Sequence, residues 1–263
     1  MEHSERPAGE HSQPLLALVD VHLAFGGVKA VSGTSFAVAA GRITGLIGPN
    51  GAGKSTICGI ISGALRPDSG RILLDGHDIG GRPAYQVSRA GIVRTFQLSS
   101  EFAKLTVLEN LITAAPEQKG ESLLGALFGR RYWGAQERRN VLRARELLDK
   151  VGLLAKQDEY AGNLSGGQKR LVEITRALMA EPRMLLLDEP MAGIHPNLAR
   201  SVADYLAQLA EGGLTMLMIE HELGLVERLC DTVVVMAQGR VISEGKMSHI
   251  RLQRNVLDAY LVG

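Results

Sequence analysis

The sequence predicts an α/β fold: a parallel sheet made of alternating strands and helices, with antiparallel strands ahead of it and a helical lobe inserted into it. Three observations lead to this prediction. Short apolar runs alternate with helical patterns over residues 184–236. Apolar and polar residues alternate in the N-terminal part, as they do in half-buried strands. A glycine-rich segment, residues 48–56, joins a short apolar run to the start of a helix.

The composition is that of a globular protein and excludes several classes of function. The chain has 263 residues, 45% of them hydrophobic, so it can bury one large core or two modest ones. No window approaches the about 18 consecutive apolar residues of a membrane span, and the N-terminus lacks the apolar run of a secretory signal. A net charge of +1 gives no electrostatic case for a nucleic-acid partner. We therefore expect a protein that stays in the cytoplasm, with Cys58 and Cys230 as reduced core residues.

The N-terminal part is expected to be rich in antiparallel strands. Residues 1–14 are polar and aperiodic and are interpreted as a mobile tail. The apolar alternation from Val19 to Phe25 predicts a strand that turns at Gly26-Gly27 into a second strand. The strands expected here span residues 19–25, 31–38, 43–47 and 71–75, the last ending in an Asp75-Gly76 turn.

The rest of the chain alternates between helices and strands around a long helical stretch. A helix at 83–90 and a strand at 92–96 come before a largely helical region at 106–158, which an insert at 116–133 interrupts. The alternation then predicts strand 184–188, helix 196–211, strand 215–219, helix 222–230 and strand 232–236. We expect residues 15–97 and 182–245 to form the β-subdomain and α/β core, 98–181 the helical lobe, and 246–263 a helical tail.

Residues 48–56 have the spacing of a phosphate-binding loop and stand between a buried strand, Arg42–Ile47, and a helix. Gly48, Gly51 and Gly53 allow backbone N–H groups to face one point, where the helix N-terminus adds partial positive charge for an anion. Because Lys-Ser follows these glycines in a strand, loop and helix context, the segment predicts a nucleoside triphosphate site rather than a structural turn.

Four side chains are expected to act on the triphosphate. The Lys54 ammonium would reach the β- and γ-phosphates, and the Ser55 hydroxyl would ligate Mg²⁺ while Thr56 continues the helix. Met184–Asp188 is an apolar strand that ends in two acids, Asp188 and Glu189. An acid at the carboxyl end of a strand beside the phosphate loop can hold Mg²⁺ through water, and the next acid can polarise the attacking water.

A second helix start, Ser165-Gly166-Gly167-Gln168, also has features of an anion-binding site. Ser165 is placed as the N-cap, and the two glycines would expose backbone N–H groups in the first turn. Since one chain has one phosphate loop, this second helix start is expected to close on the triphosphate bound by another subunit.

These motifs together resemble those of the nucleotide-binding subunit of an ATP-binding-cassette (ABC) transporter, and the similarity covers Val19 to about Gly245. Residues 48–56, Asn50 included, match the Walker A loop, 184–188 the Walker B strand and 164–168 the signature motif. The resemblance implies a P-loop NTPase core of the RecA-like kind with ATP and Mg²⁺ as ligands. It makes Glu189 the catalytic base, and it places Ser165, Gly166, Gly167 and Gln168 against the partner's nucleotide.

Three further assignments depend on position within the family's pattern. Gln97 matches the Q-loop glutamine that contacts Mg²⁺ and water, although a lone Gln after a strand is more often ordinary surface. His221 matches the switch histidine at the γ-phosphate, although a His at a strand end is usually structural. Phe25 matches the aromatic residue that stacks on adenine, although a Phe at a strand end is more often core. His195 departs from the pattern, because the D-loop usually has Asp or Asn at that position.

Within the family, several features resemble the ATPases of branched-chain amino acid importers: Gly91–Gln97, the Leu123–Trp133 insert, Ala192-Gly193 and the ending Asp258–Leu261. The insert is read either as a surface helical hairpin or as an element that contacts a partner. The resemblance implies an ATP-hydrolysing motor at the cytoplasmic face of the membrane. Its partners would be a second nucleotide-binding subunit, identical or paralogous, integral membrane permease subunits that dock on Gln97–Lys104, and indirectly an extracytoplasmic solute-binding protein.

Other functions compete with this interpretation. A soluble ABC ATPase acting on ribosomes or DNA usually carries two cassettes in one chain or a long coiled coil, and this chain has neither. A small-molecule P-loop kinase lacks a signature motif such as residues 164–168. The ATPase of a lipid or lipopolysaccharide exporter is the nearest rival, and it is expected to lack the insert at 116–133.

Overall fold

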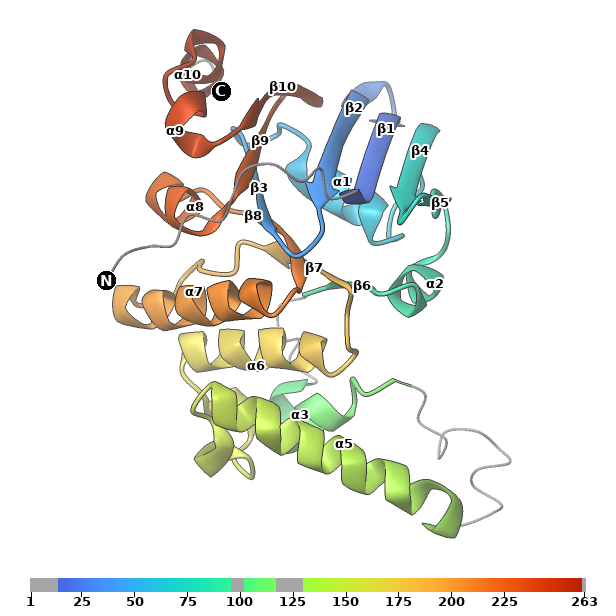
Figure 1. Ribbon diagram of the computed structural model, residues 1–263, viewed down its shortest axis with the longest axis vertical. Coiled ribbons are helices and arrows are strands. Elements are labelled where there is room, and N and C mark those ends of the chain that lie inside the picture. Colours follow the sequence, from blue (N-terminus) through green and yellow to red (C-terminus); the bar gives the residue numbers. More distant parts are fainter. Residues whose placement is uncertain (1–13, 96–101, 117–129, 262–263) are drawn as a thin grey trace.

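The computed structural model describes residues 14–95, 102–116 and 130–261 (Figure 1). The expected tail up to residue 13, Phe96 and Gln97, and residues 117–129 of the insert lie outside these ranges. In the part of the chain that is described, no helix is long and apolar enough to cross a membrane.

An antiparallel sheet forms the N-terminal lobe, as the alternation predicted. It consists of β1 (Pro14–Phe25), β2 (Val28–Ala39), β4 (Ser69–Leu74) and β5 (His77–Asp78), in the order β2-β1-β4-β5. Gly26 and Gly27 turn β1 into β2 with φ of 52° and 97°, which glycine adopts without strain. The first strand begins at Pro14, so the last residue assigned to the tail belongs to β1 instead.

The predicted alternation in β1 is wrong at Val19 because the strand contains a bulge. Asp20 has a φ of 50°, and the pairing with β2 shifts register between Leu18 and Val21. Leu18 and Val21 are therefore both buried, at 2% and 0% exposure, while Val19 faces solvent at 37%. One extra residue moves every later side chain to the opposite face.

The second sheet carries the phosphate loop and has six strands in the described part of the chain. They are β3 (Ile43–Ile47), β6 (Ile92–Arg94), β7 (Met184–Asp188), β8 (Thr215–Ile219), β9 (Thr232–Ala237) and β10 (Arg240–Gly245), in the order β10-β9-β3-β8-β7-β6. All pairs are parallel except β10 with β9. β10 was not predicted, because its mixed sequence at the sheet edge lacks the apolar run of the central strands.

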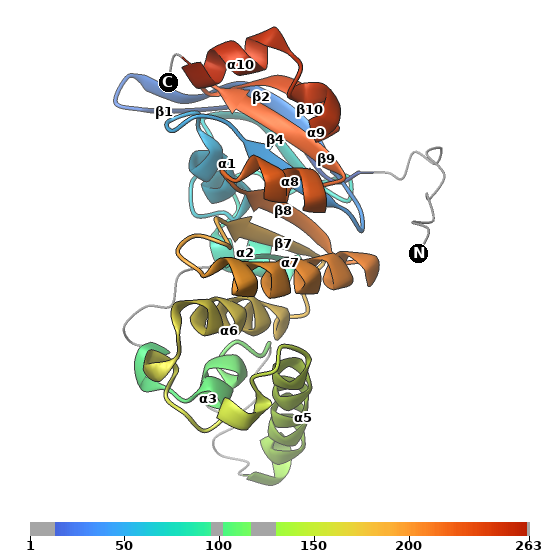
Figure 2. The same cartoon turned by 90° about the vertical axis from the view of Figure 1, so that its left-hand side faces the viewer.

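Helices cover both faces of this parallel sheet (Figure 2). The helices are α1 (Lys54–Ile61), α2 (Ala84–Arg89), α7 (Pro196–Glu211), α8 (Leu223–Leu229), α9 (Met247–Ile250) and α10 (Arg254–Leu261). Leu186 in β7 packs in the core that holds α1 and the antiparallel sheet, while its neighbours Leu185 and Leu187 pack in the other core. A strand buried on both faces explains the unbroken apolar run of β7.

The helical lobe packs below α7 through the core that also holds Leu185 and Leu187 (Figures 1 and 2). It contains α3 (Val107–Ile112), α5 (Arg130–Lys150), α6 (Gly166–Leu178) and short 3₁₀ turns at Phe102–Lys104, Leu154–Lys156 and Ala161–Asn163. Cys58 is buried and Cys230 is partly buried, both are free, and burial raises the pKa of each thiol to about 12.

Candidate active site

Three loops that follow parallel strands meet at the carboxyl edge of the sheet. The phosphate loop follows β3, Asp188 ends β7, and His221 comes two residues after β8. The acidic strand was expected to end beside the phosphate loop, and in the sheet β8 lies between β3 and β7. Asp188 therefore reaches the loop from across the strand that carries His221. Ligands of α/β sheets commonly bind at this edge.

Two glycines of the phosphate loop, Gly48 and Gly53, could not be replaced by another residue without movement of the backbone. Gly48 has a φ of 147°, and a Cβ there would lie 2.0 Å from the Met236 carbonyl oxygen. Gly53, which precedes α1, has a φ of 99°, and its Cβ would lie 2.5 Å from the Ala30 carbonyl oxygen. Because glycine has no side chain, the loop can pack this closely against the two carbonyl oxygens. Its backbone can then surround an anion at the start of α1.

Lys54 is buried against the loop that precedes it. Its Nζ donates to the carbonyl oxygens of Gly48 and Pro49 at 2.8 and 2.9 Å. Burial lowers the pKa of this ammonium group, while the carboxylates of Glu189 and Asp188 act to raise it. The cation thus already lies inside the loop, at the place where phosphate oxygens would be received.

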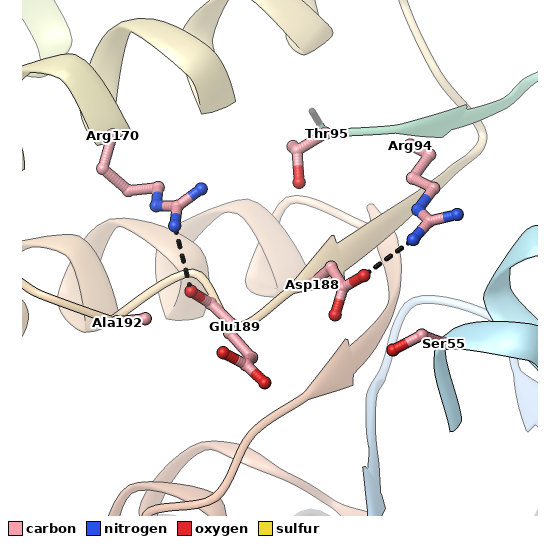
Figure 3. A pocket seen from close by; sticks show the side chains of 7 residues that line it. All are labelled: Ser55, Arg94, Thr95, Arg170, Asp188, Glu189 and Ala192. Carbon is pink, nitrogen blue, oxygen red and sulfur yellow. Dashed lines mark hydrogen bonds and ion pairs between the residues drawn. The ribbon is translucent and has the colours of Figure 1, made fainter. Parts of the chain in front are cut away.

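Ser55, Asp188 and Glu189 line one pocket, together with Thr95, Arg94, Arg170 and Ala192 (Figure 3). A serine hydroxyl and a carboxylate are hard oxygen donors, the ligands that Mg²⁺ takes together with substrate phosphates. The structure thus brings together two of the three residues that were expected to hold the metal, and their chemistry fits it; the third, Gln97, lies outside the described residues.

Glu189 and His221 contact each other directly. The His221 Nε2 atom lies 2.8 Å from Glu189 Oε1. Glu189 has a φ of 47°, a left-handed conformation that is uncommon for a residue with a side chain and that is typical of functional sites. Its amide donates to the Ile219 carbonyl at the end of β8. The backbone therefore fixes the direction in which the Glu189 carboxylate leaves β7.

Two arginines complete the pocket and were missed by the sequence interpretation. Arg94 in β6 donates to Asp188 Oδ2 at 2.7 Å. Arg170 in α6 donates to the Glu189 carbonyl oxygen at 3.2 Å (Figure 3) and also pairs with Glu173 at 2.5 Å. A charged residue at the end of the otherwise apolar strand Ile92–Arg94 was the available signal for Arg94.

Glu220 is a third missed residue. Its side chain is 5% exposed, and its two oxygens accept from the amides of Met191 at 3.0 Å and His221 at 3.3 Å. Burial raises the pKa of this carboxyl group, and the two amides act to lower it. Glu220 directly follows the buried strand Thr215–Ile219, just as Asp188 follows Leu187. This pattern could have indicated Glu220 from the sequence.

The helix start at Ser165 caps itself as predicted. The Ser165 hydroxyl accepts from the Gln168 amide at 3.4 Å, and the Gln168 side chain accepts from the Ser165 amide at 3.1 Å. Ser165 and Gly166 are exposed, whereas Gly167 is buried, and a Cβ there would meet the side chain of Leu198 in α7. Among the described residues, 165–168 do not line the pocket of Ser55 and Asp188.

The remaining candidates are dispersed around the loop. Phe25 ends β1 with 49% exposure, so it is not the core residue that a strand-end Phe more often is. Asn50 lines a separate hollow with Asn255 and Ala259 of α10. Thr56 continues α1 as expected. The carbonyl of His195 accepts from the amides of Leu198 and Ala199, which places His195 at the entry to α7.

A parallel sheet with a glycine-shaped phosphate loop, a lysine inside that loop, and an acid pair facing the following serine is the arrangement of a P-loop nucleoside triphosphatase. Comparison with known proteins specifies the class. The family model described as "ABC transporter" matches residues 31–192. The chain therefore belongs to the ABC transporter family, as its ATP-hydrolysing, nucleotide-binding subunit.

Relatives and solved structures agree with this assignment over nearly the whole chain. A probable branched-chain amino acid transport ATP-binding protein of Archaeoglobus fulgidus is 41% identical, covering 90% of this chain and 91% of that protein. The high-affinity branched-chain amino acid transport ATP-binding protein of Pseudomonas aeruginosa is 37% identical, covering 95% and 98%. A crystal structure of a nucleotide-free ATP-binding cassette from an ABC transporter superposes with a TM-score of 0.83 at 37% identity, covering 94% and 98%.

Proposed function

We propose that this chain is the motor subunit of an importer for branched-chain or other hydrophobic amino acids. Relatives that match at least 90% of the chain carry that function in their names. It would act at the cytoplasmic face of the membrane with permease subunits, which receive their solute from an extracytoplasmic binding protein. Two nucleotide-binding subunits, identical or paralogous, would enclose two ATP·Mg²⁺.

The observation that carries the catalytic part is the contact of Glu189 with His221 beside Asp188 and Ser55. The Glu189 carboxylate would accept a hydrogen bond from the attacking water and orient it toward the γ-phosphate. His221 would hold that carboxylate and contact the same phosphate. Lys54 and the loop amides would stabilise the negative charge that spreads over the phosphate oxygens.

Magnesium fits the donor set of this pocket. The Ser55 hydroxyl and the Asp188 carboxylate would hold the ion, with Gln97 as a further ligand from outside the described residues. When bound, Mg²⁺ would neutralise charge that develops on the phosphate oxygens.

Closure on the partner subunit would use the exposed helix start at Ser165 and Gly166. Both residues face solvent in the single chain, and the capping box uses the amides of Ser165 and Gln168, which leaves the Gly166 amide at the N-terminal start of α6. A phosphate of the partner's nucleotide is the anion that such a helix start would receive.

The test is Glu189→Gln in a strain that lacks the chromosomal copy of the chain. The amide keeps the size of the side chain but cannot act as a carboxylate, so we expect ATP binding to persist, turnover to fall by at least about a hundredfold, and an ATP-stabilised dimer to accumulate. Size-exclusion chromatography with ATP and a phosphate-release assay measure both effects.

Uptake in the same strain tests the solute. Deletion should abolish high-affinity uptake of leucine, isoleucine and valine, the wild-type gene should restore it, and Glu189→Gln should not. Near-normal hydrolysis by the variant would contradict the catalytic role of Glu189, whereas normal uptake in the deletion strain would contradict only the solute assignment.

A further inference from the structure

Asp188, which is expected to help hold Mg²⁺, is already paired with a cation of its own chain. The Arg94 Nη2 atom donates to Asp188 Oδ2 at 2.7 Å, and the two side chains are only 16% and 26% exposed. Figure 3 shows Asp188 with Arg94 on one side and Ser55 on the other. The guanidinium group thus lies at the carboxylate that the metal would need.

The pairing follows from the sheet and is not an accident of a surface side chain. Arg94 lies opposite Leu186 in the parallel ladder of β6 with β7, and Thr95 continues the contact by donating its amide to the Leu186 carbonyl at 3.0 Å. This register brings the Arg94 side chain alongside the end of β7, where Asp188 stands. In a half-buried pocket such a charge pair is screened less than one in open water.

The other cations near the pocket already have partners. Arg170 pairs with Glu173 and the Glu189 carbonyl, and Lys54 donates to the loop carbonyls of Gly48 and Pro49. Within the described part of the chain, Arg94 is therefore the cation that is hydrogen-bonded to Asp188, while Lys54 acts on Asp188 only through space.

We propose that Arg94 is a specificity-determining residue that suppresses binding of a bare divalent cation at Asp188, so that the metal binds only together with the negative phosphates of a nucleotide. The proposal rests on the metal-holding role proposed for Asp188. A lone divalent cation meets a carboxylate whose charge is already compensated. A cation that binds together with a triphosphate is accompanied by the negative charge of the phosphates. Arg94 can then interact with the phosphates instead of with Asp188.

The test is Mn²⁺ binding, as a Mg²⁺ substitute, measured by electron paramagnetic resonance on the full chain without nucleotide. Arg94→Gln removes the charge but keeps a hydrogen-bond donor, and it should bind Mn²⁺ at least about tenfold more tightly than the wild type. Arg94→Lys keeps the charge and should remain close to the wild type. Arg94→Met is the second uncharged variant if the glutamine variant fails to fold.

The chain offers a matched control in Arg183, which pairs with Asp75 at 2.9 Å on the surface. Arg183→Met should leave Mn²⁺ affinity unchanged. Adding Asp188→Asn to Arg94→Gln should abolish the gain in affinity.

Two results would overturn the proposal. One is a folded Arg94→Gln variant whose Mn²⁺ affinity equals or falls below that of the wild type, which would indicate that Arg94 only orients Asp188. The other is tight Mn²⁺ binding that persists in the double variant, because the ion would then lie elsewhere. Hydrolysis of ATP by the wild type with Mg²⁺ is a separate measurement, so a failure of the proposed function is distinguishable from either result.

Discussion

The buried Glu220 side chain connects two loops of the active site, the loop after β7 and the loop after β8. One of its oxygens binds the amide of Met191, three residues after Asp188, and the other binds the amide of His221. Because His221 in turn contacts Glu189 at 2.8 Å, a single buried carboxylate fixes the backbone on both sides of that contact. Buried carboxylates are costly unless hydrogen bonds compensate them, so this one indicates a positioning role.

Glu220→Gln should therefore lower turnover by about tenfold while ATP affinity changes little, because the amide nitrogen now faces a backbone N–H group. Single-turnover hydrolysis and equilibrium nucleotide binding separate the two quantities. Glu222→Gln, an exposed acid on the same loop, is the control and should behave as the wild type. A Glu220→Gln variant with normal turnover would contradict the positioning role.

The difference in stability between the wild type and Glu220→Gln should depend on pH. Burial raises the pKa of Glu220 in the folded state above its unfolded value, so its contribution to stability is present below the unfolded pKa and is lost as pH rises through the folded pKa. The free energy of unfolding of the wild type, relative to the variant, should fall over this window by at most about 1.4 kcal/mol per pH unit. Urea titrations from acidic to neutral pH measure it, and a difference that does not change with pH would contradict the prediction.

Single residues could be predicted from the sequence where a motif fixes their neighbours in space. Lys54 and Ser55 follow the loop glycines directly, and Asp188 and Glu189 follow an apolar strand, so local sequence places them. Arg94 could not be placed in this way. Its contact with Asp188 depends on β6 pairing with β7, two strands 90 residues apart whose neighbour relation is set by the whole sheet.

At the scale of elements, strands buried on both faces were predicted with their bounds. Met184–Asp188 and Thr215–Ile219 agree residue by residue with β7 and β8, as does the helix Pro196–Glu211 with α7. The errors fall where the local pattern is ambiguous. The bulge at Asp20 moves the residues after it to the opposite face of β1 from the one that strict alternation would give. β10 has a mixed composition because it is an edge strand.

The phosphate loop allows a prediction that compares two of its glycines. Gly51 has a φ of 78° with open space around its Cβ position, whereas a Cβ at Gly48 would meet the Met236 carbonyl oxygen at 2.0 Å. Gly51→Ala should cost only the left-handed strain, about 1 kcal/mol of unfolding free energy. Gly48→Ala must also move backbone and should cost about 3 kcal/mol, with loss of nucleotide binding.

Guanidinium chloride denaturation of both variants tests this order. Equal costs would show that the contact of Gly48 with β9 is not a constraint on the loop. A Gly51→Ala variant more damaged than Gly48→Ala would contradict the prediction outright.

At the scale of the whole molecule, a hollow lies between the α/β core and the helical lobe. It is lined by Ser88 and Val93 of the core, by Phe102, by Arg176 in the last turn of α6, and by Ala180 just after that helix. Arg176 lies over the Phe102 ring, 3.6 Å from its centroid, and burial lowers the pKa of its guanidinium group. Phe102 belongs to Gln97–Lys104, the segment expected to dock the permease subunits, and the structure finds it partly buried at the edge of the hollow.

This position makes Phe102 a testable contact for a permease helix. Its backbone carbonyl accepts from Asn110 Nδ2 at 2.9 Å, so the 3₁₀ turn at Phe102–Lys104 is held independently of the Phe side chain. Phe102→Asp should therefore keep nucleotide binding and soluble ATPase activity. It should weaken association with the permease subunits by roughly thirtyfold, the equivalent of about 2 kcal/mol for a buried aromatic anchor.

The expected outcome is release of the Phe102→Asp protein from membranes, with loss of leucine uptake in cells. Tyr85→Asp is the matched control, because Tyr85 is also an aromatic residue beside an arginine, with Arg89 5.8 Å from its ring centroid, but it is 60% exposed and does not line the hollow. Membrane fractionation and uptake assays compare the two variants. Loss of ATP binding by Phe102→Asp would show that Phe102 supports the fold, and a membrane-bound variant with normal uptake would show that the permease docks elsewhere. Release by Phe102→Asp but not by Tyr85→Asp would place the permease contact at the hollow between the two lobes, beside Phe102.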